Sequence, residues 1–202
     1  MPQLYLAHLL DLKPYEGTLT KCLSECRKDG RTPASLSTIL AARVERNKED
    51  EVWQDCFVSN GILYAPNDRI YIIPPNYNPV FKKPNRTSKE INMGRKGLWL
   101  SPKEFKRIRL NSYLFREVSE SNEGSYSVLT EFPDEELLKD IFGDFPGNIN
   151  YMLDLRIQNI DELCFNFTEK SDYVPYSRAI TFRKGEITDE PDVTEKGRLW
   201  GL

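Results

Sequence analysis

The chain has 202 residues, 39% of them hydrophobic, and a formal net charge of −3. This composition supports one hydrophobic core or two small ones. The longest apolar run, residues 4–10, is far shorter than the roughly 20 residues of a membrane span. No cation precedes this run and Asp11 ends it, so we expect no signal peptide. Membrane, fibrous and disordered classes are therefore excluded, and a soluble cytoplasmic protein is expected.

Two helices joined by a short turn are predicted near the N-terminus. The first spans 18–28, where apolar residues recur at helical spacing, and Gly30 follows where a helix would end. The second begins with Thr32 as N-cap and Pro33 in its first turn. The pair is either a plain helical hairpin or a helix-turn-helix that presents its second helix to DNA. In the latter case the exposed polar face consists of Ser35, Ser37, Thr38, Arg43 and Arg46.

Two cysteines share the apolar face of the first predicted helix. Cys22 and Cys26 are four residues apart, which places them one above the other. The ordinary interpretation is that both are small buried hydrophobes. The alternative is a zinc site formed by Cys22, Cys26, Cys56 and His8. Because the short Cys-x-x-Cys spacing of most structural zinc sites is missing, we expect no resident metal and no cofactor.

Three short strands in an antiparallel meander are predicted next. The first of these strands is predicted at residues 53–58. Asn60-Gly61 is a strong signal for a two-residue hairpin turn before a second strand at 62–64. Residues 66–68 then turn the chain into a third strand at 69–73.

The segment 74–97 is predicted to be irregular. It has no apolar periodicity and contains Pro74, Pro75, Pro79 and Pro84. A structureless stretch of this length inside a domain is uncommon and is typically functional or disordered. After it, Ser101, Pro102 and Glu104 match a capping box and predict a short helix.

The remaining pattern favours an α+β fold, because strands and helices do not alternate regularly. Predicted strands lie at 110–118, 125–132, 149–157, 163–168 and 178–182, and a helix is predicted at 134–142. A last strand at 186–192 is predicted to end in acidic turn residues. The expected order is an N-terminal helical hairpin, a small antiparallel meander, a basic irregular central segment, and a mixed antiparallel sheet with one or two helices. The boundaries predict subdomains at 1–81, 82–109 and 110–202, or one compact domain overall.

Charge is segregated along the chain. Residues 82–109 hold ten cations and two acids, a net charge of +8, whereas residues 110–202 carry −10. A basic segment of this kind can contact phosphates, dock onto an acidic protein surface, or form an ordinary solvated face. Tyr77 and Phe81 lie beside it and are candidates for stacking on bases. The candidate cations are Lys82, Lys83, Arg86, Lys89, Arg95, Lys96, Lys103, Lys106, Arg107 and Arg109.

The leading hypothesis is therefore a non-enzymatic protein that binds DNA or RNA through the basic central segment, as a component of a larger complex. The first alternative is a protein–protein interaction subunit that docks an acidic partner through the same segment. The second is a metal-dependent nuclease built on Asp68, Glu104 and Lys106, since two acids and a lysine suffice for that chemistry. The chain has a single histidine, which excludes mechanisms that need two.

Overall fold

The computed structural model describes residues 11–46, 49–66, 69–95, 97–117, 126–127, 164–166, 174–183, 186–188 and 194–202. The strands are β1 Lys13–Gly17, β2 Cys56–Ala65, β3 Arg69–Ile73, β4 Leu98–Trp99, β5 Tyr113–Glu117, β6 Tyr126–Ser127, β7 Cys164–Asn166, β8 Tyr176–Arg183, β9 Glu186–Thr188 and β10 Gly197–Gly201. The helices are α2 Leu19–Lys28, α3 Leu36–Glu45, α4 Pro79–Lys82, α5 Pro84–Asn92 and α6 Pro102–Arg109, with 3₁₀ turns η1 Glu51–Trp53 and η2 Pro75–Tyr77. Each of these helices is too short or too polar to cross a bilayer.

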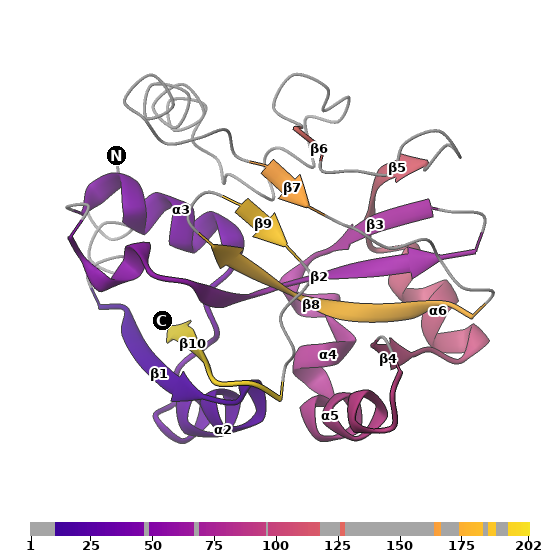
Figure 1. Ribbon diagram of the computed structural model, residues 1–202, viewed down its shortest axis with the longest axis horizontal. Helices are drawn as coiled ribbons and strands as arrows, with labels where there is room; N and C mark the ends of the chain where they lie inside the picture. The colour runs from indigo at the N-terminus through magenta and orange to yellow at the C-terminus, as the bar shows by residue number, and fades with distance from the viewer. Residues whose placement is uncertain are drawn as a thin grey trace.

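The described strands form one mixed sheet (Figure 1). Its main path runs β1-β10-β2-β8-β9-β7-β6, while β3 pairs with β2 and β5, and β4 pairs with β8. Among the described strands, β1 and β10 lie nearest the two ends of the chain, and they pair antiparallel along their whole length. Strand β10 then joins β2 in parallel. The sheet therefore takes strands from both the N-terminal and the C-terminal parts of the sequence.

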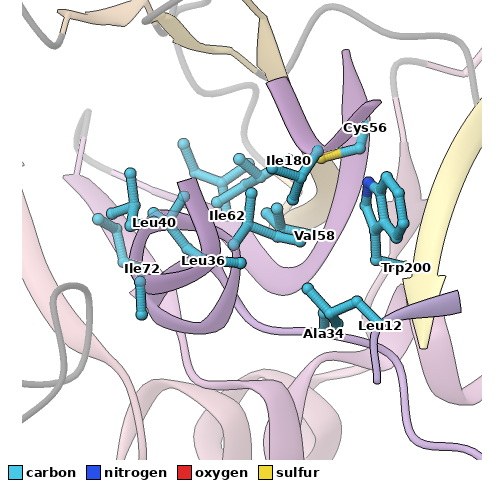
Figure 2. Packing of buried hydrophobic residues seen from close by; sticks show 14 of the residues in the cluster. Leu12, Ala34, Leu36, Leu40, Cys56, Val58, Ile62, Ile72, Ile180 and Trp200 are labelled. Atoms are coloured by element: carbon cyan, nitrogen blue, oxygen red, sulfur yellow. The ribbon is translucent and has the colours of Figure 1, made fainter. Parts of the chain in front are cut away.

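The two faces of this sheet carry two separate hydrophobic clusters. Successive side chains of a strand point to opposite faces. Val58, Ile62 and Ile72 accordingly pack with helix α3 in one cluster, which Figure 2 shows from close by. Phe57 and Leu63 belong to the other cluster, which also contains residues of α2, α4 and α6. The fold is thus a central sheet with α3 on one face and the other described helices on the opposite face (Figure 1).

The predicted helical hairpin is wrong. Helix α2 forms as expected, with Thr18 as its N-cap and its apolar stripe buried. Helix α3 begins three residues later than predicted, because Ser35 caps it and Pro33 instead bridges to Gly201 beside the sheet. The two helices consequently lie on opposite faces of the sheet. The helix-turn-helix alternative fails as well, because Arg43 is 3% exposed and has no access to a DNA groove.

The Asn60-Gly61 hairpin prediction is also wrong. Both residues lie inside the single strand β2, at a bulge between Val58 and Gly61 where the register with β8 shifts. The side chain of Asn60 accepts a hydrogen bond from the backbone of Leu36 at 2.8 Å, which fixes the start of α3. The later turn prediction is correct, since Ala65 of β2 pairs with Arg69 of β3. The turn residues 67 and 68 lie outside the described residues.

The predicted irregular segment is largely helical. Pro75, Pro79 and Pro84 each occupy the first position of η2, α4 and α5. A proline at that position costs no hydrogen bond, because the first amide of a helix has no partner within the helix. The prolines thus mark helix starts, and the segments between them are too short to show an apolar period.

Several other expectations are confirmed. The capping box of α6 forms between Ser101 and Glu104, with Pro102 in the first turn. Strands β5, β7 and β8 overlap the predicted 110–118, 163–168 and 178–182, and the overall class is α+β. Strands β1, β4 and β10 had no counterpart in the prediction. The predicted helix 134–142 and strand 149–157 lie outside the described residues.

Candidate basic interface and polar cleft

Three cations of the basic segment are held by its two acids. Lys83 Nζ lies 2.5 Å from Oε1 of Glu104, and Arg86 Nη1 lies 3.3 Å from the same oxygen. Arg86 Nε is 2.8 Å from Glu90 Oε1, and Arg95 Nη1 is 3.5 Å from Glu90 Oε2. We call these five residues the acid–base network. This network joins α5 to the start of α6. Three of the ten cations in residues 82–109 therefore stabilise the fold.

The acid–base network also fixes strand β4. Glu90 is buried, and its Oε2 accepts a hydrogen bond from the backbone amide of Trp99 at 2.7 Å. Arg86 donates to the carbonyl of Trp99 at 2.8 Å, while the Arg95 guanidinium lies 4.1 Å from the centroid of the Trp99 ring. A buried carboxylate needs such partners to offset its loss of water. The indole of Trp99 is accordingly covered by an arginine.

Glu104 is a structural carboxylate. Its Oε2 accepts hydrogen bonds from the backbone amide and hydroxyl of Ser101, at 3.0 and 2.9 Å. The hydrogen bond from Lys83, followed by those from Ser101, lowers the pKa of Glu104 from 4.5 to about 2. Both oxygens are thus engaged, which removes support for the nuclease hypothesis. Its second acid, Asp68, lies outside the described residues, and Lys106 is exposed.

Replacing Glu104 by glutamine, which keeps the shape but removes the charge, is expected to lower the free energy of unfolding by about 1–2 kcal/mol at pH 7. Because the pKa of Glu104 is lower in the folded protein than its ordinary value of 4.5, the stabilisation is complete above that pH. It disappears as the pH falls toward 2. Urea unfolding of both proteins between pH 7 and pH 2 measures this convergence. A constant difference at every pH would contradict it, and Glu195→Gln, at an exposed position, provides the control.

Of the remaining cations of the segment, the six that the structure describes are exposed. Helix α6 carries four of them, and among the described residues no ion pair involves any of the four. Lys103, Lys106 and Arg107 follow an i, i+3, i+4 spacing, so they share one face of the helix. Leu110 continues that face and is 74% exposed. We call Lys103, Lys106, Arg107 and Arg109 the α6 cations.

The two predicted stacking residues have different environments. Phe81 is 5% exposed and packs in the core, so the proposal that its ring stacks on a base is wrong. Tyr77 is 38% exposed, and Lys82 Nζ lies 5.8 Å from the centroid of its ring. Lys89 is exposed on α5, and Lys96 lies outside the described residues.

The proposed zinc ligands are not brought together. Cys22 and Cys26 are buried in the cluster that contains α2, whereas Cys56 belongs to the cluster on the other face of the sheet. The thiol groups of Cys22 and Cys26 donate to backbone carbonyls, Cys22 to Tyr15 at 3.2 Å and Cys26 to Arg31 at 3.4 Å. Burial raises the pKa of Cys22 and of Cys56 to about 11, which keeps both thiols protonated near neutral pH. The cysteine set is therefore not a metal site, and His8 lies outside the described residues.

A polar cleft of about 790 Å³ opens between the ends of β1 and β10, the start of α2, and η1. This volume is within the range of small-molecule sites. The cleft was missed by sequence reasoning because its lining comes from three distant segments, near residues 16–21, 53–55 and 196–198. Charges of both signs and one indole line it: Glu16, Lys21, Trp53, Asp55, Lys196 and Arg198.

Comparison with known proteins identifies the fold. No family model matches the chain, and no curated protein matches it. A solved structure does match, described as "Accommodation of massive sequence variation in Nanoarchaeota by the C-type lectin fold". It superposes with a TM-score of 0.65 at 11% sequence identity, over 95% of this chain and 97% of that chain. The chain therefore has a C-type lectin-like fold, and its strands β1 and β10 pair at one edge of the sheet.

Proposed function

We propose that this chain is a non-enzymatic binding protein that contacts nucleic acid, DNA or RNA, through the α6 cations. The observation that carries the proposal is that these four side chains are exposed and form no ion pair with the described residues, whereas Lys83, Arg86 and Arg95 are each paired with an acid. Lys103, Lys106 and Arg107 lie on one face of the helix, where they can contact successive phosphates of a nucleic-acid backbone. We further propose that the protein acts in the cytoplasm as a component of a larger complex.

The acid–base network supports this function indirectly. Lys83 and Arg86 tie the start of α6 to α5, so the helix is held firmly while its basic face stays open. A pre-positioned surface loses less conformational entropy on binding than a flexible loop does.

The test is fluorescence anisotropy of labelled single- and double-stranded DNA and RNA at about 50 and 200 mM salt. If three or four phosphates are neutralised, the affinity for duplex falls roughly 100-fold between these salt concentrations. The triple variant Lys103→Glu, Lys106→Glu and Arg107→Glu is expected to lose binding even at low salt. The matched control makes the same charge change at exposed lysines away from α6, with Lys21→Glu, Lys28→Glu and Lys196→Glu.

Two results would contradict the proposal. The first is an absence of binding to every probe at low salt. The second is an equal loss of binding in the α6 variant and in the matched control, because net charge alone would then explain it.

Exposed apolar residues beside the α6 cations favour a second candidate function. Leu110 is 74% and Leu114 is 43% exposed, and apolar side chains next to cations suit an acidic protein partner better than a phosphate backbone. On this alternative the protein is an interaction subunit. Its partner would co-purify after nuclease treatment and would be lost on changing Leu110 to serine. Nucleic-acid binding would be unaffected by that change.

A further inference from the structure

We propose that the polar cleft binds a zwitterionic ligand, a free amino acid or short peptide that carries both an ammonium and a carboxylate group. The cleft is separate from the α6 cations, since it is formed by β1, α2, η1 and β10. Three features support the inference. One carboxylate oxygen of Glu16 has no partner among the described residues, and Lys21 and Lys196 have no strong partner there. The indole of Trp53 forms a fixed wall of the cleft.

Glu16 offers the position for an ammonium group. Its Oε1 lies 2.5 Å from Arg198 Nη2, and no described residue contacts its Oε2. Glu16 is 69% exposed at the side chain, whereas Arg198 is only 13% exposed and also pairs with Glu51 at 3.3 Å. The guanidinium is therefore already balanced by two carboxylates. A ligand ammonium can bind the open oxygen without breaking this ion pair.

Lys21 and Lys196 offer the position for a carboxylate. Both are exposed and line the cleft. Within the described part of the chain, Lys21 has one ion pair, to Glu25 at 3.9 Å, and Lys196 has none. An ammonium on a flexible stem can adjust its position to a carboxylate. A ligand with charge of one sign only would leave either these lysines or Glu16 without a new partner.

Trp53 forms the apolar wall of the cleft and is held in place by Arg43. The Arg43 guanidinium lies 5.5 Å from the centroid of the Trp53 ring. Arg43 also donates to the carbonyls of Val52 at 2.8 Å and Gln54 at 3.1 Å, so it fixes the backbone on both sides of the indole. A preorganised ring of this kind suits an apolar or aromatic ligand side chain.

The experiment is isothermal titration calorimetry of the full chain with three probes: the dipeptide glycyl-phenylalanine, its N-acetylated form, and its C-terminal amide. The free dipeptide is expected to bind with a Kd of about 0.1–1 mM, as its size allows. Each blocked form is expected to bind at least about tenfold more weakly, because one charge-assisted hydrogen bond is lost. Glu16→Gln is expected to abolish the difference between the free and acetylated forms. Lys196→Ala weakens the free form, and Lys28→Ala, at an exposed lysine outside the cleft, leaves it unchanged.

Three outcomes would overturn the proposal. They are no detectable heat up to about 10 mM dipeptide, equal binding of all three probes, and tighter binding of the acetylated form than of the free one. Equal binding would identify a purely apolar cleft, and tighter binding of the acetylated form would identify a simple anion site. None of these results depends on the α6 cations, so the proposed nucleic-acid function is tested separately.

Discussion

Replacing Asn78 by alanine lowers the free energy of unfolding by about 3–4 kcal/mol, because three buried backbone groups lose their partners. Asn78 is 0% exposed and lies against the bulge of β2. Its Nδ2 donates to the carbonyls of Ser59 and Asn60, both at 2.9 Å, and its Oδ1 accepts from the amide of Val80 at 3.0 Å. One side chain thus caps α4 and joins it to the central strand.

Urea unfolding followed by circular dichroism measures this loss. Asn76→Ala is the matched control, since Asn76 lies two residues away and is exposed; it is expected to change the stability by less than about 0.5 kcal/mol. Asn78→Asp should destabilise at least as strongly as alanine, because it removes both donated hydrogen bonds and places a carboxylate beside two carbonyl oxygens. A loss below about 1 kcal/mol for Asn78→Ala would show that the bulge relaxes without this side chain.

Replacing Gly197 by alanine lowers the free energy of unfolding by about 2–3 kcal/mol, because the added methyl group overlaps a core ring. A Cβ at this position would lie 2.4 Å from Cε2 of Phe57. Phe57 is buried in the cluster beneath α2, and its neighbour in the sheet is Leu199 of β10. Phe57 is 2% exposed and packed in the core, so either its ring or the strand must shift to admit the methyl group.

A double-mutant cycle separates this overlap from other effects of the substitution. Phe57→Leu removes the outer part of the ring and costs stability by itself. In the double variant the new methyl group occupies part of the vacated space, so the combined loss is expected to be smaller than the sum of the two single losses. Strict additivity would show that contact with Phe57 is not the cause. Thermal unfolding of all four proteins supplies the numbers.

Sequence patterns predict a helix correctly where all the interacting residues lie within one short segment. The stripe of Leu19, Cys22, Leu23 and Cys26 predicted α2, and the capping box of Ser101 and Glu104 predicted α6. Both depend on contacts three or four residues apart, which the sequence shows directly. The strand predicted at 178–182 overlaps β8.

Other local signals were overridden by contacts from distant segments. Asn60-Gly61 resembles a hairpin turn, but Gly61 is needed because a Cβ there would lie 2.8 Å from the side chain of Asn78. Asn60 is used to hold the start of α3 through the amide of Leu36. The strands β1 and β10 had no recognisable pattern of their own. They form because segments near the two ends of the described chain pair with each other at one edge of the sheet.

The sequence by itself determined the class of the protein and the location of its excess charge: an α+β chain with +8 concentrated in residues 82–109. Only the tertiary structure decided which of those charges are open to a partner. Glu90 and Glu104 hold Lys83, Arg86 and Arg95, whereas the α6 cations have no such partner among the described residues. The polar cleft likewise depends on segments far apart in the chain. The physical reason is the same in both cases, because the free energy of a charge depends on its neighbours in space rather than in sequence.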